Sequence, residues 1–245
     1  MVARYFIKHM RSEAMPSFTL PISTLFSNPV GFLRNLLISA PAILIALTLH
    51  EVAHGLVAYR CGDPTAKRMG RLSLNPLRHL DPVGTLLLVF VGFGYAKPVP
   101  VNPAYFKKPR RDDLLVSIAG ICMNLILFAL FGTVFFWYIN FAPDALFNEY
   151  VYYFLYYCAQ INACLAVFNV LPLPPLDGYH IVNDVLLRRP LFASQRQAQM
   201  GQGVLLLLII TGLLDKYIAF CVGDGGSGLW GGLFFIFKSV AERFI

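Results

Sequence analysis

The chain has 245 residues, of which 57% are hydrophobic and 13% are charged, against about 25% charged residues in soluble proteins. This composition excludes an ordinary soluble protein and indicates a polytopic membrane protein of one or two domains. The net charge of +7 does not predict nucleic-acid binding, because the lysines and arginines lie in loops between apolar runs, where they set orientation and contact anionic lipid.

The first 60 residues contain a surface segment and one long span. Residues 1–28 combine a basic start with a stretch containing Pro, Ser and Thr, so we expect an interfacial segment, and we expect no cleaved signal peptide because no apolar core precedes a small-residue cleavage site. The run from about Pro29 to Arg60 is long and apolar enough to cross a bilayer. Its second half contains His50-Glu51-Val52-Ala53-His54.

This H-E-x-x-H motif predicts a metal site. Residues four apart share one face of a helix, so His50 and His54 can bind one metal ion through their ring nitrogens. Zinc is the expected metal because neutral imidazole suits it, and Glu51 can take a proton from a metal-bound water. The alternative is a buried polar cluster that satisfies itself, which a membrane helix disfavours because ionisable groups there are costly and normally functional.

The next stretch predicts a short membrane-buried element between two basic loops. The loops are residues 60–79 and 107–111. Residues 83–96 are apolar but shorter than the roughly 20 residues that a span requires, and alternate prolines in residues 95–103 favour extended backbone. We therefore expect a re-entrant or β-hairpin element at about 83–103.

Further apolar runs complete the membrane topology. Spans are expected at about 114–142, 150–170 and 203–214, and residues 229–237 either span or lie at the interface. If the four long helices each cross once and residues 83–96 do not cross, these two basic loops share one side with a third basic loop at residues 188–196. The positive-inside rule places that side in the cytoplasm. We expect an all-α polytopic fold with about four to six membrane segments around an intramembrane zinc site. Its parts are an interfacial segment 1–28, a core 29–221 that contains the metal site, and a short span or interfacial helix 222–245.

A catalytic zinc ion needs a third protein ligand and an open position for water. Asp177 is the best candidate because it ends a long uncharged stretch and follows Pro172, Pro174 and Pro175, which break the preceding helix. Irregular backbone at membrane depth is tolerated where it is buried in protein or lines a cavity. The alternative is a turn in which Asp177 caps the next helix.

Several motifs in chain order resemble the site-2 protease family of intramembrane zinc metalloproteases, in its compact bacterial branch without PDZ or CBS domains. The matching stretches are residues 50–54, Asn75-Pro76 with residues 79–84, residues 94–101, Ala119-Gly120 through Asn124, and Asn169-Val170-Leu171-Pro172 through Asp177-Gly178. The resemblance implies His50, His54 and Asp177 as ligands of one zinc ion, Glu51 as catalytic base and Asn124 near the reaction centre. It implies a transmembrane protein substrate in a bacterial inner membrane. Because the motif lies nearer the Arg60 end of its span, which leads into a basic loop, we expect the site nearer the cytoplasmic side.

Some roles stay open at this stage. Asn124 either donates a hydrogen bond to the substrate or the oxyanion, or makes an interhelical contact. His79 and His180 lie either near the site or in interfacial loops. The chain has Gly120-Ile121 where many relatives carry Gly-Pro, and Tyr179-His180 where many carry Gly-Arg. A metal-binding transporter or a silent scaffold is the competing function, and Glu51 favours the protease because a transporter needs no general base beside its ligands.

The proline-rich segment also suggests how a substrate is held. A helical peptide bond is shielded, so the site must hold the substrate extended. Pro98 and Pro100 lie on one edge of the expected strand, which leaves the amides of Lys97, Val99 and Val101 on the other edge to pair with substrate. The alternative is a loop that plugs the cavity or lies at the lipid surface.

Overall fold

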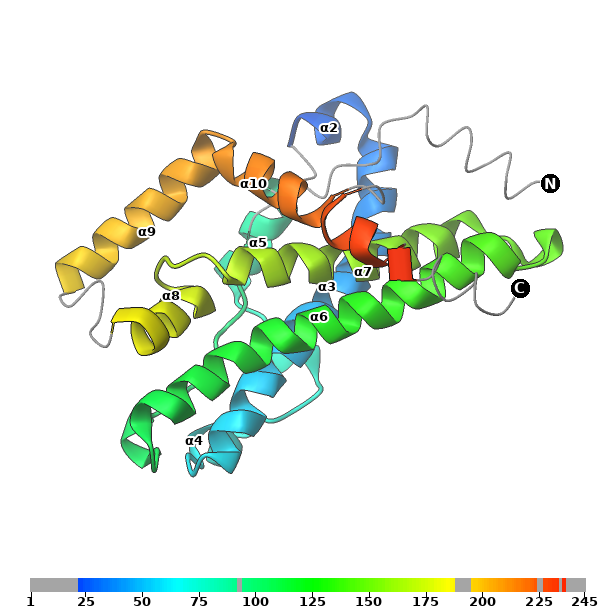
Figure 1. Ribbon diagram of the computed structural model, residues 1–245. Helices are drawn as coiled ribbons and strands as arrows, with labels where there is room; N and C mark the ends of the chain where they lie inside the picture. Colours follow the sequence, from blue (N-terminus) through cyan, green and yellow to red (C-terminus); the bar gives the residue numbers. More distant parts are fainter. Residues whose placement is uncertain (1–21, 92–93, 188–194, 224–226, 234, 237–245) are drawn as a thin grey trace. The chain divides into compact units, whose positions relative to one another are not determined.

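The computed structural model describes residues 22–91, 94–187, 195–223, 227–233 and 235–236. Three of its helices are long and apolar enough to cross a membrane: α3 (Pro29–Arg60), α6 (Pro109–Phe141) and α7 (Glu149–Asn169) (Figure 1). A fourth span exists if the bent pair α9 (Gln195–Ile210) and α10 (Leu213–Val222) counts as one. The expected all-α polytopic fold is thus confirmed, with three candidate spans among the described residues, or four with the bent pair, against the expected four to six membrane segments.

The remaining regular structure among the described residues consists of short helices and turns. These are α2 (Ile22–Ser27), α4 (Thr65–Arg68), α5 (Pro82–Val91), α8 (Asp177–Val182), 3₁₀ turns at Pro76–Arg78, Pro103–Tyr105 and Asp144–Leu146, and a π turn at Asn183–Leu187. Residues 228–233 are also helical. Most of the expected N-terminal segment, and part of the C-terminal one, lie outside the described residues.

The helix boundaries follow from local chemistry. The first span begins and ends at the expected residues, but α6 begins five residues before the expected Leu114, at Pro109. Proline suits the first position of a helix because its missing amide would be unpaired there. Asp112 then lies in the first turn, where a carboxylate is favoured, and it accepts a 2.9 Å hydrogen bond from the amide of Lys108.

The fourth expected span differs more. The sequence predicts one helix at about 203–214, whereas α9 and α10 meet at an angle of 78°. The break lies at Gly212, whose φ of 67° is left-handed. Glycine adopts this conformation without the steric penalty of a Cβ, so it can end one helix and begin the next in a new direction.

The re-entrant element is mostly helical. α5 has 10 residues, too few to span a bilayer, and Asp81 caps it by accepting a 2.9 Å hydrogen bond from Gly84 N–H. The expected hairpin is reduced to one isolated bridge between Leu80 and Ala96 in the described part of the chain. The prolines that follow lack the amide donors that a longer ladder needs. Beside the bridge, buried His79 hydrogen bonds through Nε2 to the Ser73 carbonyl at 2.8 Å and closes this turn.

The chain forms two compact units, residues 1–48, 73–98 and 127–161 in the first and residues 49–72, 99–126 and 162–245 in the second. In the first unit, the Arg34 guanidinium lies 5.8 Å from the centre of the Tyr153 ring, and Phe135 makes an edge contact with Tyr152 at 5.1 Å between centroids. The predicted site residues all belong to the second unit.

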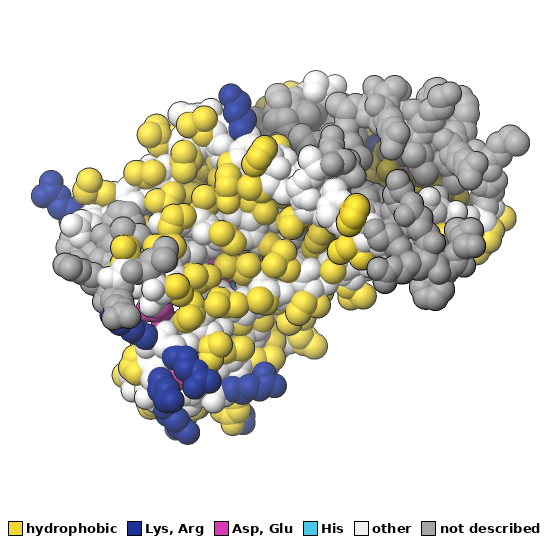
Figure 2. Space-filling model, viewed as in Figure 1, with side chains coloured by type: hydrophobic (Ala, Val, Ile, Leu, Met, Phe, Trp, Pro, Cys, Tyr) yellow, Lys and Arg dark blue, Asp and Glu magenta, His cyan; other side chains and the backbone are white. Residues whose placement is uncertain are grey.

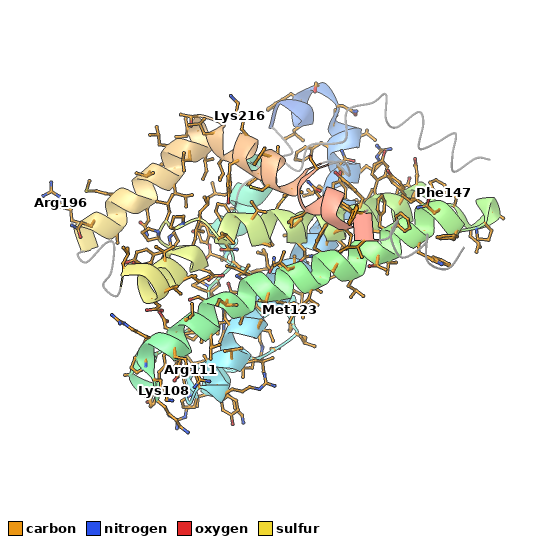
Figure 3. All side chains as sticks on the ribbon, viewed as in Figure 1. Lys108, Arg111, Met123, Phe147, Arg196 and Lys216 are labelled. Carbon is orange, nitrogen blue, oxygen red and sulfur yellow. The ribbon has the colours of Figure 1, made fainter. Side chains whose placement is uncertain are left out.

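The second unit combines a small apolar core with a basic end. The core contains Ala58, Phe106 and Val116, which come from α3, the loop before α6, and α6. Lysine and arginine side chains gather at the start of α6, whereas hydrophobic side chains cover the viewed face of α9 (Figure 2). Lys108 and Arg111 lie at that end of α6, and Arg196 lies at the start of α9 (Figure 3). These ends adjoin the basic stretches predicted at residues 107–111 and 188–196, of which residues 188–194 lie outside the described part of the chain.

Candidate metal centre

The two histidines of the H-E-x-x-H motif are buried on one face of α3, with 7% and 9% of their surfaces exposed. His54 Nδ1 lies 2.7 Å from the Val116 carbonyl oxygen, which can only accept a hydrogen bond, so Nδ1 carries the proton. His50 Nδ1 likewise lies 2.7 Å from Oδ1 of Asn124. In the neutral rings both Nε2 atoms therefore present lone pairs, and they face each other at 3.0 Å.

Asp177 brings a third acceptor to the same point. It is the first residue of α8, and its Oδ2 lies 3.5 Å from Nε2 of His50 and 3.4 Å from Nε2 of His54. Oδ2 has no hydrogen-bond donor among the residues that the structure describes. The helix is preceded by Leu176 and has no side-chain cap, so the geometry favours a ligand role over the capping alternative.

This donor set fits a zinc ion. Three lone-pair atoms that converge without a proton repel each other, and a cation between them removes the repulsion. Zinc binds imidazole nitrogen and carboxylate oxygen at about 2.0–2.2 Å in a tetrahedron, which separates neighbouring ligand atoms by about 3.3–3.5 Å. The observed separations of 3.0, 3.4 and 3.5 Å are close to that. The sequence-predicted ligands form the one group of this kind found among the described residues.

Gly120 on α6 makes room for the pair of imidazoles. A Cβ at this position would lie 2.4 Å from Nε2 of His54 and 2.6 Å from Cε1 of His50. No real Cβ approaches that closely, so any side chain at residue 120 would push against the metal-binding edges of both rings. Gly120 belongs to one of the motifs found in the sequence, but its spatial role could not be inferred from that motif.

Glu51 is half-buried, and its carboxylate already has a partner. Its Oε2 accepts a 2.7 Å hydrogen bond from the backbone amide of Val99. The expectation that the amides of Lys97 and Val99 are available for a substrate is wrong, because both amides have partners within the chain. The N–H of Lys97 donates to the His79 carbonyl at 2.8 Å. The N–H of Val99 donates to the Glu51 carboxylate, and a charged acceptor makes this the stronger type of hydrogen bond.

Asn124 is fully buried and is in direct contact with the site. Its Oδ1 accepts from His50, while its Nδ2 has no hydrogen-bond partner in the described part of the chain. The Asn124 side chain therefore makes the interhelical contact that the sequence left open. Its Nδ2 group remains available for the alternative role, a hydrogen bond to the substrate or the oxyanion. Such an oxygen beside a ligating histidine fixes the tautomer and the ring orientation.

His180 lies one turn after Asp177 on α8 and is half exposed. Its Nδ1 is 3.0 Å from Oδ2 of Asp113 on α6. This hydrogen bond raises the pKa of His180 against the effect of burial. The pair ties the helix that carries Asp177 to the start of α6, so His180 supports the site from outside the ligand set.

The site combines an H-E-x-x-H helix, a carboxylate from a second helix and a third helix that contacts the rings. This combination, in a fold with several apolar helices long enough to cross a membrane, is that of a candidate metallohydrolase centre. The family model of peptidase family M50 matches residues 38–147 and 138–210. The chain therefore belongs to peptidase family M50, the site-2 protease family, and is a metalloprotease. This assignment favours the protease over the transporter considered from the sequence.

Similar proteins from other organisms carry names that are consistent with this family. The candidate zinc metalloprotease YwhC of Bacillus subtilis (strain 168) is 40% identical over 200 residues, which cover 81% of this chain and 90% of the relative. The candidate zinc metalloprotease Rip2 of Mycolicibacterium smegmatis is 28% identical over 77% of this chain and 73% of its own length. The zinc metalloprotease MJ0392 of Methanocaldococcus jannaschii is 24% identical over 72% of this chain and 43% of its own length. No solved structure gives a significant match.

Proposed function

We propose that the chain is a zinc-dependent intramembrane endopeptidase that hydrolyses peptide bonds within or near the transmembrane segments of membrane proteins, as in regulated intramembrane proteolysis. One observation carries the proposal. Three potential ligand atoms, Nε2 of His50, Nε2 of His54 and Oδ2 of Asp177, converge within 3.5 Å of one another. Two of them lie on a 32-residue apolar helix that is long enough to cross a bilayer.

In this proposal His50, His54 and Asp177 hold one zinc ion. When bound, zinc polarises the scissile carbonyl and makes a water acidic enough to be deprotonated near neutral pH. Glu51 takes that proton as the water oxygen attacks the carbonyl carbon. It then delivers the proton to the leaving amine, so that one water and one peptide bond give a carboxylic acid and an amine.

Asn124 has two proposed roles, one toward His50 and one toward the substrate. Its Oδ1 keeps the proton of His50 on Nδ1, so that Nε2 stays free for the metal. Its buried Nδ2 has no partner among the described residues and can donate to the substrate backbone or to the oxyanion. A buried donor without an acceptor is costly, and a substrate carbonyl would remove that cost.

The orientation and the boundaries of the active core are part of the proposal. By the positive-inside rule, the basic side chains near Lys108 and Arg111 favour the cytoplasmic side of a bacterial inner membrane for the start of α6 and the adjacent loops. The metal site then lies nearer that side. We assign the metalloprotease core to residues 29–221, with residues 1–28 and 222–245 as flanking segments that contact the membrane.

A survey of membrane peptides tests the proposal. Peptides from membranes of cells that express the wild type, or Glu51→Gln, are compared by mass spectrometry. Glutamine cannot take the proton but has nearly the same size, so the variant should keep zinc and lose the cleavage products. New termini inside hydrophobic segments that need Glu51 support the proposal. Termini that occur only in soluble domains, or equally in both samples, contradict it.

A further inference from the structure

A buried carboxylate outside the metal centre has no part in the chemistry described so far. Asp63 lies three residues after the end of α3 and is fully buried. Its Oδ1 accepts hydrogen bonds from the amide (2.9 Å) and the hydroxyl of Thr65. Its Oδ2 accepts a 2.7 Å hydrogen bond from the amide of Asn102. The first two bonds are made to Thr65, the first residue of α4, whereas the third reaches a segment 39 residues away in sequence.

Segment 99–102 links Asp63 to the proposed catalytic base. Its last residue, Asn102, is bonded to Asp63, and its first residue, Val99, is bonded through its amide to Oε2 of Glu51 at 2.7 Å. Glu51 and Asp63 are both carboxylates that lie in or directly after α3. The segment is therefore held at both ends by the same stretch of chain, 12 residues apart.

The side chain of Val99 explains why the segment lies so close to α3. Val99 is buried, with 7% of its surface exposed. A Cβ at Gly55 would lie 3.1 Å from Cγ1 of Val99 and 2.5 Å from Cδ2 of Leu72. Gly55 is one turn after Glu51, so it lies on the same side of the helix. The absence of a side chain there lets the backbone of Val99 approach the carboxylate.

We propose that Asp63 is a positioning residue of the protease, which anchors segment 99–102 so that the Val99 amide holds the Glu51 carboxylate in its working orientation. The inference rests on the proposed role of Glu51. A carboxylate has two oxygens: the Val99 amide fixes one, and the other is left to face the water. Without the anchor the segment still contacts Gly55, but its amide no longer has a fixed position.

Hydrogen–deuterium exchange of the full-length protein in detergent tests the anchor without any substrate. Between Pro98 and Pro103 only Val99, Val101 and Asn102 carry amide hydrogens, because proline has none. Glu51→Ala should speed exchange at Val99 alone, and Glu51→Gln should not, because the glutamine oxygen still accepts. Asp63→Ala should speed exchange at Asn102 and also at Val99, which Asp63 does not touch.

Cleavage of a substrate found in the membrane-peptide survey tests the consequence. Asp63→Ala should lower kcat about tenfold or more, because a small displacement of a catalytic group is costly. KM should change by less than about twofold, since the substrate contacts remain, and zinc content should be that of the wild type. Asp63→Asn retains one acceptor oxygen, so its kcat should lie between those of the wild type and Asp63→Ala. Val99→Pro removes the donor itself and should match Asp63→Ala.

Thr65→Ala is the matched control. It removes one hydrogen bond to the same carboxylate and weakens α4, but it leaves the bond to Asn102, so exchange at Val99 and kcat should stay at wild-type values. A loss of kcat equal to that of Asp63→Ala would overturn the proposal, because the effect would then come from α4. If Asp63→Ala does not fold, the kcat values of Asp63→Asn and Val99→Pro test the proposal instead, and wild-type kcat in both would overturn it.

The failure of the inference can be told apart from failure of the proposed function. If wild type cuts transmembrane segments and Asp63→Ala does so at the same kcat, the positioning role is wrong and the protease stands. A higher kcat in Val99→Pro would also overturn it, because the amide would then restrain Glu51 instead of aiding it. If wild type cuts no membrane segment, the proposed function is wrong, and unchanged exchange at Val99 in Asp63→Ala would still refute the anchor.

Discussion

Oδ1 of Asn124 lies 2.7 Å from Nδ1 of His50, and through this contact an uncharged residue on α6 sets the protonation of a ring on α3. Replacement by leucine keeps the approximate size but removes the acceptor. We expect Asn124→Leu to weaken zinc binding about 10–100-fold, as is typical when a partner of a ligating histidine is lost. Titration with a competing chelator measures the affinity.

Asn124→Asp is the control for this prediction. Aspartate keeps an acceptor in the same place, so its zinc affinity should exceed that of Asn124→Leu. If leucine and aspartate variants bind zinc as tightly as the wild type, the histidine orientation does not depend on residue 124.

Gly120→Ala should remove the metal site with the addition of one methyl group. Its Cβ would lie 2.4 Å from Nε2 of His54, so either the ring or α6 must move. We expect little bound zinc in the purified variant and no cleavage. Elemental analysis measures the bound zinc, a substrate cleavage assay measures the activity, and thermal unfolding shows whether the variant is folded.

Gly203→Ala is the matched control because a Cβ at Gly203, on α9, meets no atom within 4 Å. Alanine is favoured over glycine inside a helix by roughly 0.5–1 kcal/mol, so this variant should keep its zinc and be as stable as the wild type or slightly more so. Equal zinc content in the two variants would show that Gly120 does not limit the site.

The bond between His180 and Asp113 should make stability depend on pH. The pKa of His180 is raised in the folded protein, chiefly by this hydrogen bond. The His180–Asp113 pair therefore stabilises the folded state fully below the pKa of histidine in the unfolded chain, about 6.5. This stabilisation is lost as the pH rises through the higher pKa of His180 in the folded protein. Because the two side chains are 47% and 25% exposed, we expect less than about 1 kcal/mol.

Thermal unfolding of the wild type and of His180→Ala at pH 6 and pH 9 measures this. The difference between their midpoints should be larger at pH 6. A difference that is constant with pH, or larger at pH 9, would mean that the pair does not form in solution.

Side-chain chemistry determined how much could be predicted from the sequence. The long spans could be predicted because each is a run of apolar residues, and the site could be predicted because zinc requires particular side chains at particular spacings. The structure brings His50, His54 and Asp177 together as that reasoning expects. Asp177 was the hardest of the three, because its distance from the histidines in the chain carries no periodic signal.

The parts that could not be predicted depend on backbone groups. The partner of His54 is the carbonyl of Val116, and the partner of Glu51 is the amide of Val99. Almost every residue supplies these groups, so no residue type marks them. The bend between α9 and α10 depends on one left-handed residue, Gly212, and glycine is also tolerated inside membrane helices, so its presence alone does not locate a break.

The metal content of the purified protein tests the central claim most directly. Wild type and the double variant His54→Ala, Asp177→Ala are purified from zinc-supplemented cells and analysed for bound metal by elemental mass spectrometry. Three ligands from two helices should hold about one zinc ion per chain in wild type, and the double variant, with one ligand left, should hold none. A wild type without zinc, or a double variant with as much zinc as wild type, would contradict the assignment of His50, His54 and Asp177 as the metal site.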